Sequence, residues 1–270
     1  MNIGIQQYRR GSRSARLLQV ELEKIYPFGR VLRAKPDKAR IKINWGSSRV
    51  IPNTLIYLNH PQKVKYAIDK RLTFEKLNGK VPVPPFTTDE EEAYNWVTEN
   101  EWKLVARLKP NGAHGEGIKI IRSVDEFEEA PLYTRFFPRK KEYRVIICGN
   151  HIVAYMRKIL KPELRERGEG HSEIRNSDRY VFVNLKPEAV QTRGALKEIA
   201  FATKEAMELD FCAIDVIKNL QNGQFYVLEV NTAFGLGENN ARKMARAIVS
   251  LLGETKLKRV LETTKLNSGG

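Results

Sequence analysis

Residues 211–231 read FCAIDVIKNLQNGQFYVLEVN, two apolar segments joined by a short polar turn. Apolar and β-branched runs on either side of Asn-Gly predict a β-hairpin. Asp215 lies inside the first run, and Glu229 lies inside the second. A carboxylate in such surroundings costs free energy unless a positive charge pairs with it. The hairpin therefore predicts a site where acids meet cations.

The length of the turn decides whether the two acids face each other. A three-residue loop at 221–223, with Gly223 left-handed, puts Asp215 opposite Glu229. Asn231, two residues further on, then lies on the same face. A two-residue turn would instead put Asp215 on the other face. On these residues alone, both turns stay open.

Directly opposed carboxylates destabilise a sheet, so this face requires positive charge. Carboxylate and amide oxygens suit Mg²⁺, which usually keeps several waters and is shared with nucleotide phosphates. The alternative is that both acids pair with Lys or Arg from elsewhere in the chain. On these residues alone, both interpretations stay open.

Composition and charge limit the class of protein. The 270 residues are 41% hydrophobic and 29% charged, with a formal net charge of +15. This is a globular balance with room for one large domain or two to three small ones. The charge favours an anionic partner. Two cysteines, Cys148 and Cys212, exclude a disulfide framework. Neither a signal peptide nor a long apolar run occurs, so we expect a cytoplasmic protein.

The chain alternates helices and strands in an α+β pattern without internal repeats. Helical spacing predicts a helix over 64–77, and VPVPPF (81–86) must be extended. The segment Lys109–Gly117, KPNGAHGEG, lies between two predicted strands and lacks a Walker A ending. Strand pairs are predicted at 142–148 and 152–159, and long helices at 186–209 and 239–252, followed by a short basic helix from Thr255. Residues 162–179 are predicted to be a loop.

Glycines and cations supply candidate phosphate ligands. Gly112, Gly115 and Gly117 would let backbone N–H groups point at phosphate oxygens, although the loop taken alone favours a mobile surface hairpin. Cations lie in or beside apolar segments, where phosphates would serve as partners; they are Lys70, Arg107, Arg144, Arg157 and Lys158. Each taken alone is more often a surface charge, but together with the paired acids they favour a phosphate site.

The order of these features resembles the ATP-grasp superfamily. The chain looks most similar to the ribosomal-protein glutamate ligase and related carboxylate–amine ligases. The matching segments are DKRLTFEKL with VPVPPF, LVARLKPNGAHGEGIKII, LYTRFFPRKKEYRVIICGNHIVAYMRK and AIDVI…YVLEVNTAFGL, which together span about residues 60 to 250.

The resemblance implies a fold in which two α+β lobes clamp a nucleotide behind a short N-terminal α/β domain. The implied boundaries are 1–58 for that domain, 59–131 for the small lobe, 132–254 for the large lobe and 255–270 for a basic tail. Departures occur at Arg107, where lysine is usual, at Arg135, where glutamate is frequent, and at Ala233, where a small polar residue is usual.

The resemblance also implies roles for single residues. Mg²⁺, as two ions or replaced by Mn²⁺, would be bound by Asp215, Glu229 and Asn231, and this shared role favours the three-residue loop that makes the two acids face each other. ATP would be bound by Lys70, Arg107, Gly112, Gly115, Gly117, Tyr133, Arg135, Phe136 and Glu142. Arg144 and Arg157 would face the transferred phosphate, and Lys158, Arg175 and Asn176 would contact substrate.

The implied reaction is ATP-dependent joining of a carboxylate to an amine through an acyl phosphate, with release of ADP and phosphate. The net charge favours an acidic or nucleic-acid-linked acceptor. Two alternatives stay open: a kinase on the same fold, and a non-enzymatic nucleic-acid-binding protein that uses the basic surface alone.

Overall fold

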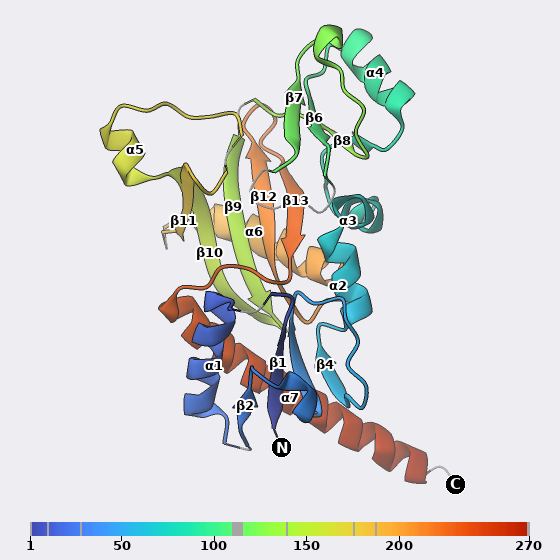
Figure 1. Ribbon diagram of the computed structural model, residues 1–270, viewed down its shortest axis with the longest axis vertical. Helices are drawn as coiled ribbons and strands as arrows, with labels where there is room; N and C mark the ends of the chain where they lie inside the picture. Colours follow the sequence, from blue (N-terminus) through green and yellow to red (C-terminus); the bar gives the residue numbers. More distant parts are fainter. Residues whose placement is uncertain are drawn as a thin grey trace.

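The computed structural model describes residues 2–9, 11–27, 29–109, 116–138, 140–174, 176–186 and 188–268, with side chains up to residue 254. Three sheets follow one another along the long axis of the molecule (Figure 1). Within this part of the chain, no helix is both long and apolar enough to cross a membrane.

The N-terminal sheet has four parallel strands in the order β2-β1-β3-β4. Its elements are β1 (Ile3–Gln7), α1 (Arg13–Ile25), β2 (Val31–Leu32), a 3₁₀ turn (Pro36–Lys38), β3 (Ile41–Trp45) and β4 (Ile56–Leu58). Strand β3 is buried on both faces, as expected for a central parallel strand.

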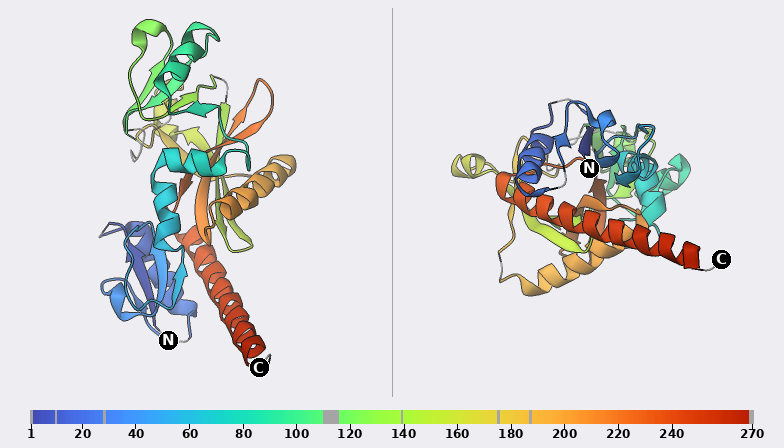
Figure 2. Two further views of the ribbon diagram at one scale, coloured as in Figure 1. Left: turned by 90° about the vertical axis from the view of Figure 1, so that its right-hand side faces the viewer. Right: turned by 90° about the horizontal axis from the view of Figure 1, so that it is seen from below.

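The last helix, α7 (Glu238–Ser268), packs on α1 and joins the N-terminal sheet to the large sheet. Its buried residues share one core with β1, β3 and the lower ends of β9 and β12. The backbone is helical through Ser268 and projects beyond the N-terminal sheet (Figures 1 and 2). The prediction of a separate short helix from Thr255 is therefore wrong.

The small sheet has the antiparallel order β5-β8-β6-β7. Its strands are β5 (Phe86–Thr87), β6 (Leu104–Arg107), β7 (Ile118–Ile121) and β8 (Tyr133–Arg135), and a 3₁₀ turn lies at Val124–Glu126. Helix α4 (Glu90–Thr98) covers one face through Ala93 and Val97. Strand β8, which lies beyond residue 131, pairs with β5 and β6 in this sheet.

Two short helices, α2 (Pro61–Ile68) and α3 (Lys70–Leu77), connect the N-terminal and small sheets. A single helix was predicted here. Asp69 interrupts it by adopting extended backbone angles, and its carboxylate accepts a hydrogen bond from the Arg71 N–H. Asp69 thus begins a second helix, which places Lys70 at the first position of α3.

The large sheet has the antiparallel order β11-β10-β9-β12-β13. Its elements are β9 (Lys140–Cys148), β10 (His151–Leu160), α5 (Pro162–Glu166), β11 (Tyr180–Asn184), α6 (Val190–Ala206), β12 (Phe211–Asn219) and β13 (Phe225–Asn231). The predicted helix 186–209 is shorter at both ends, and the predicted loop 162–179 contains α5.

The two faces of the large sheet have different neighbours. One face packs on α6 through an apolar core that includes Val145, Ile214 and Val216. The lower end of the opposite face is apolar, and Ile146 and Ala213 there join the core shared with α7. Above that level, the same face carries charged side chains.

The β12–β13 hairpin pairs Asp215 with Glu229, as predicted. The loop is one residue longer than the predicted three-residue loop. The Asn219 carbonyl accepts a hydrogen bond from the Gly223 N–H, and the Asn219 N–H donates to the Gln224 carbonyl, so residues 220–223 form a four-residue loop. Gly223 is left-handed, with φ 74°. A bulge beside Asp215 then shifts the register by one residue and restores the opposition of the two acids.

Candidate active site

A row of charged residues crosses the upper half of the large sheet. Arg144 on β9 lies opposite Asp215 on β12, which lies opposite Glu229 on β13. The Arg144 guanidinium donates two hydrogen bonds to the Asp215 carboxylate, at 2.6 Å and 2.7 Å. The Lys70 ammonium lies 3.2 Å from the Glu229 carboxylate. Four elements thus bring their charges to one place.

Burial and charge act in opposite directions on these groups. Burial would raise the pKa of Glu229, but the charges of Lys70, Arg107 and Arg144 outweigh it and lower the pKa. Burial raises the pKa of Asp215, and Arg144 opposes that shift. Glu229 is therefore an anion held by three cations.

Arg107 lies at the end of β6, on the face of the small sheet opposite α4. It is only 9% exposed, and its Nε has no hydrogen-bond partner in the protein. Burial lowers its pKa, and the charge of Glu229 opposes this. A buried guanidinium N–H without a partner fits an anionic ligand such as a phosphate group.

Asp215, Glu229 and Asn231 share one face at neighbouring positions of the hairpin. Their carboxylate and amide oxygens form the kind of donor set that Mg²⁺ prefers. Among the described residues, no group of three or more His, Cys, Asp or Glu side chains could hold a metal. Phosphate oxygens would have to complete a magnesium site here, which is the usual arrangement with nucleotides.

A second row lies two residues along the same face. Lys158 on β10 pairs with Glu142 on β9, and their charged atoms are 3.2 Å apart. Phe182 on β11 lies beneath both cations: the Arg144 guanidinium is 4.1 Å from the ring centroid, and the Lys158 ammonium is 5.5 Å from it. Glu142 and Lys158 thus join the site, and Phe182 supplies an aromatic surface for it.

Arg157 does not lie with these residues. It pairs with Tyr143, which packs in the apolar core on the α6 face, and its side chain is exposed. Because side chains alternate along a strand, Arg157 lies on the face opposite Arg144 and Lys158. The structure therefore does not bring Arg157 together with the charged row.

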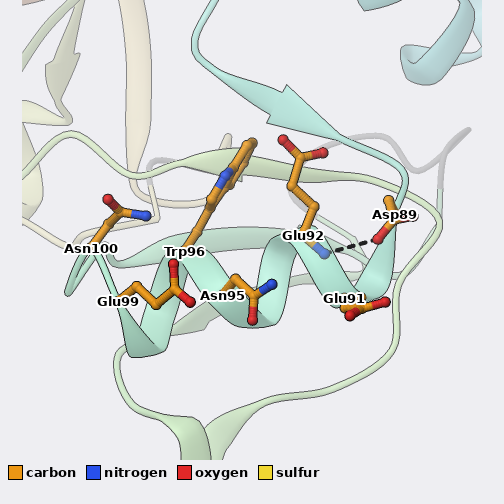
Figure 3. A pocket seen from close by; sticks show the side chains of 7 residues that line it. All are labelled: Asp89, Glu91, Glu92, Asn95, Trp96, Glu99 and Asn100. Carbon is orange, nitrogen blue, oxygen red and sulfur yellow. Dashed lines mark hydrogen bonds between the residues drawn. The ribbon is translucent and has the colours of Figure 1, made fainter.

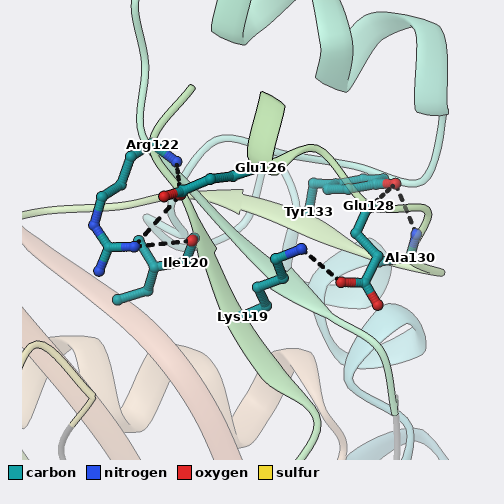
Figure 4. A network of polar contacts seen from close by, with 7 residues as sticks. All are labelled: Lys119, Ile120, Arg122, Glu126, Glu128, Ala130 and Tyr133. Carbon is teal, nitrogen blue, oxygen red and sulfur yellow. Dashed lines mark hydrogen bonds and ion pairs between the residues drawn. The ribbon is translucent and has the colours of Figure 1, made fainter. Parts of the chain in front are cut away.

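Tyr133 and Arg135 also lie on the far side of their strand. Tyr133 is fully buried against α4, and its hydroxyl donates to the Glu128 carbonyl and accepts from the Ala130 N–H (Figure 4). Arg135 stacks over Trp102 at 4.3 Å. Thr134, between them, pairs with Val105 on the face that carries Arg107. The side chains of Tyr133 and Arg135 therefore lie on the face opposite Arg107, and the backbone of β8 pairs with β5 on one edge and with β6 on the other.

The other predicted residues are scattered. Phe136 is buried beneath the Lys140 ammonium, 4.5 Å from its ring centroid. Gly117 closes the stem of the glycine-rich loop, where its carbonyl accepts from Leu108. Asn176 accepts from the Arg179 N–H inside its own loop. Gly112, Gly115 and Arg175 lie outside the described residues.

The N-terminal sheet meets the loop that follows Asn231. A Cβ placed on Gly46, just after β3, would lie 2.5 Å from the Cβ of Ala233. Further along the same loop, the Leu236 N–H donates to the Ser14 hydroxyl at 3.0 Å. The carboxyl end of β3 and the start of α1 therefore contact the loop that follows Asn231.

Two surface hollows lie elsewhere. One, of about 480 Å³, lies along α4 and is acidic (Figure 3); it is lined by Asp89, Glu91, Glu92, Asn95, Trp96, Glu99 and Asn100. The other, of about 520 Å³, lies between β7 and residues 172–174, where Arg122 and Glu173 form an ion pair at 2.5 Å. Neither contains the charged row, so we assign the site from its chemistry rather than from these hollows.

Strand β11 and Phe182 were not predicted. The run YVFVN at 180–184 carries a strand signal of β-branched and aromatic residues that could have identified the strand. The contact of Phe182 with Arg144 could not be inferred, because it depends on β11 pairing with β10.

Residues 128–250 match the model of the RimK-like ATP-grasp domain. No curated protein sequence matches the chain significantly. A structure of the ATP-grasp ligase PsnB with its minimal precursor is 11% identical, with a TM-score of 0.64 over 92% of this chain and 97% of that chain. D-Alanine–D-alanine ligase from Bacillus anthracis with ATP is 13% identical, with a TM-score of 0.65 over 94% and 99%. A RimK domain ATP-grasp protein from Sphaerobacter thermophilus is 13% identical, with a TM-score of 0.62 over 92% and 99%.

Two further PsnB structures hold ligands, one Mg and ADP and the other the precursor peptide PsnA2 with AMPPNP. The fold of the present chain is the ATP-grasp fold. The comparisons thus show the ATP-grasp fold for the chain and a match to the RimK-like ATP-grasp domain for residues 128–250.

Proposed function

We propose that this protein is an ATP-dependent ligase that joins a carboxylate to an amine through an acyl phosphate. The observation that carries the proposal is the direct opposition of Asp215 and Glu229 on a face ringed by Lys70, Arg107 and Arg144. Such a site suits magnesium and the phosphates of a nucleotide together.

The residues divide into three groups in this proposal. Asp215, Glu229 and Asn231 would hold one or two Mg²⁺ ions, or Mn²⁺. When bound, the metal would neutralise charge on the phosphoryl oxygens. Lys70 and Arg107 would bind the nucleotide phosphates, and Glu142 would lie near the ribose.

Arg144 and Lys158 are the cations that we assign to the transferred phosphate. The first step forms a bond between a substrate carboxylate oxygen and the γ-phosphorus and breaks the bond to the β,γ-bridging oxygen, so ADP leaves. In the second step, the amine nitrogen attacks the acyl carbon, the bond to the phosphate oxygen breaks, and the amine loses a proton. Both steps place negative charge on phosphoryl oxygens, which fixed cations stabilise.

The acceptor is proposed to be a peptide or another amine-bearing chain. PsnB, which shares the fold, has been determined with a precursor peptide. The +15 net charge favours an acidic acceptor.

The test is to supply ATP and Mg²⁺ with a panel of amino acids and acidic peptides, and to measure ADP release and the product mass. ADP should form only when a carboxylate and an amine are both present. Asp215→Asn and Glu229→Gln should each reduce release by at least about a hundredfold, in line with the loss of a preorganised electrostatic group. Glu91→Gln, an exposed acid on α4, is the control and should match wild type.

Other outcomes would identify another function. A stable phosphorylated product without an amine requirement would indicate a kinase. Salt-sensitive nucleic-acid binding that survives Asp215→Asn, with no ADP release, would indicate a nucleic-acid-binding protein.

A further inference from the structure

The charged row has an excess of positive charge. Lys70, Arg107 and Arg144 contribute three cations, and Asp215 and Glu229 contribute two anions, which leaves a net charge of +1. Adding the Lys158–Glu142 pair leaves the total unchanged. A divalent cation that approaches alone therefore meets a site that is already overcompensated, whereas a triphosphate meets an attractive one.

Arg144 also binds the Asp215 carboxylate, which the metal would need as a ligand. Its Nε and one Nη bond the two different oxygens of Asp215, so both carboxylate oxygens are engaged. The Arg144 and Asp215 side chains are only 18% and 14% exposed, which means that water screens the pair weakly. Metal binding at Asp215 has to compete with this two-bond ion pair.

Phe182 would hold the Arg144 guanidinium in place when its ion pair with Asp215 opens. The guanidinium already lies 4.1 Å above the ring centroid. Such stacking leaves the edge N–H groups available, and the planar fork fits phosphate as well as it fits carboxylate. Arg144 can thus exchange Asp215 for a phosphate oxygen without leaving the ring.

We propose that Arg144 closes the metal site in the nucleotide-free protein and gives up Asp215 only when metal and nucleotide bind together. This inference rests on the proposed ATP site and concerns its order of binding. Arg144 then has two successive partners: Asp215 in the free protein, and an anionic oxygen of the nucleotide or acyl phosphate afterwards.

The test measures Mn²⁺ binding by the loss of the free-ion electron paramagnetic resonance signal, with no substrate present. Wild type should bind Mn²⁺ alone at least about tenfold more weakly than it does with AMPPNP, because the nucleotide brings the missing negative charge. Arg144→Met should strengthen nucleotide-free Mn²⁺ binding by at least about tenfold, because it removes both the charge and the competing bonds.

Two controls separate this effect from a general change in charge. Lys158→Met removes one positive charge from the same face but leaves the Arg144–Asp215 pair in place, so it should have a smaller effect. The double variant Arg144→Met with Asp215→Asn should lose the gain. Because Arg144→Met leaves a buried carboxylate without its partner, Arg144→Lys is the second variant, which retains charge but not the two-bond geometry.

Thermal unfolding supplies an independent readout. Mn²⁺ without nucleotide should raise the Tm of Arg144→Met and Arg144→Lys but not that of wild type, because a ligand that binds the native state stabilises it. The inference is overturned if wild type binds Mn²⁺ equally well with and without AMPPNP, or if neither Arg144 variant gains Mn²⁺ binding. Failure of the proposed function differs: wild type would then bind no AMPPNP at all.

Discussion

At the scale of single residues, the two buried acids of this site are compensated by different sets of cations. Asp215 and Glu229 are both buried acids, yet Asp215 is held by one guanidinium and Glu229 by several cations. The carboxylates prevent repulsion among the cations, and the cations prevent repulsion between the carboxylates. The cluster is consequently stable without a ligand and remains attractive to phosphate.

Phe182 provides a prediction at this scale. Phe182→Leu should lower kcat/KM for ATP by about two- to thirtyfold, because a cation–π contact contributes about 0.5–2 kcal/mol. Phe182→Tyr keeps the ring and should behave like wild type. Steady-state ADP release with the best substrate pair measures both.

Val181→Ala is the control for the Phe182 variants, because Val181 lies on the opposite face of the same strand and is 38% exposed. A general loosening of edge strand β11 would lower kcat/KM in both the Val181 and the Phe182 variants. If Val181→Ala lowers kcat/KM as much as Phe182→Leu does, or if Phe182→Leu has no effect, Phe182 does not position Arg144.

At the scale of elements, the β12–β13 hairpin explains how the acids come to face each other. A loop of four residues by itself would pair Asp215 with Leu228, since the pairs near the turn follow that register. The bulge beside Asp215 leaves Leu228 out of the strand pairing, so Asp215 pairs with Glu229 instead. Bulges often re-aim side chains in this way next to active sites.

Glu208 holds other elements together. It pairs with Lys63 on α2 and with Lys76 on α3, the latter at 2.7 Å. Hydrogen bonds from Lys63 and Lys76 lower the pKa of Glu208 from 4.5 to about 2. A lowered pKa in the folded state stabilises the protein above the unfolded value, and this stabilisation is lost as pH falls through the folded value.

Glu208→Gln should therefore lower the urea midpoint at pH 7, and the difference from wild type should shrink between pH 4.5 and about 2. Glu198→Gln, an exposed acid of α6, is the control and should change the midpoint little at any pH. A difference that stays constant with pH would mean that charge at Glu208 does not contribute.

At the scale of the whole molecule, the N-terminal sheet and the large sheet act as one body. They share a core with α1 and α7. Asn59, after β4, binds the backbone at Asp210 and Phe211, where β12 begins. Through these contacts, the N-terminal sheet holds the strand that carries Asp215.

Gly46 and Gly11 allow this coupling to be tested. Both have left-handed backbone angles, with φ of 81° and 84°. An added Cβ would lie 2.5 Å from Ala233 at Gly46 but would meet nothing within 4 Å at Gly11. Gly11→Ala should cost about 1 kcal/mol through backbone strain alone. Gly46→Ala should cost more and should also weaken AMPPNP binding, because Ala233 follows the strand that carries Asn231.

Urea denaturation measures the loss of stability, and AMPPNP titration in the presence of Mg²⁺ measures the loss of nucleotide affinity. Equal losses of stability, with unchanged AMPPNP affinity in both variants, would show that the Gly46–Ala233 contact does not reach the site.

Much of this site follows from the sequence. Acids inside apolar runs, with cations inside neighbouring strands, indicated a charged site in the large sheet, and the family resemblance indicated the ATP-grasp fold. The reason is local: strand periodicity and the cost of burying a charge are properties of short segments.

Only the tertiary structure decided which cations belong to the site. Arg157 and Lys158 are adjacent in sequence, and the pairing of β10 with β9 puts Lys158 at the site and Arg157 on the other face. Strand pairing likewise put the side chains of Tyr133 and Arg135 on the face opposite Arg107. The pairing of edge strand β11 with β10 brought Phe182 to the site. A shift of one residue in register reverses every side chain of a strand, and register depends on bulges and on distant partners.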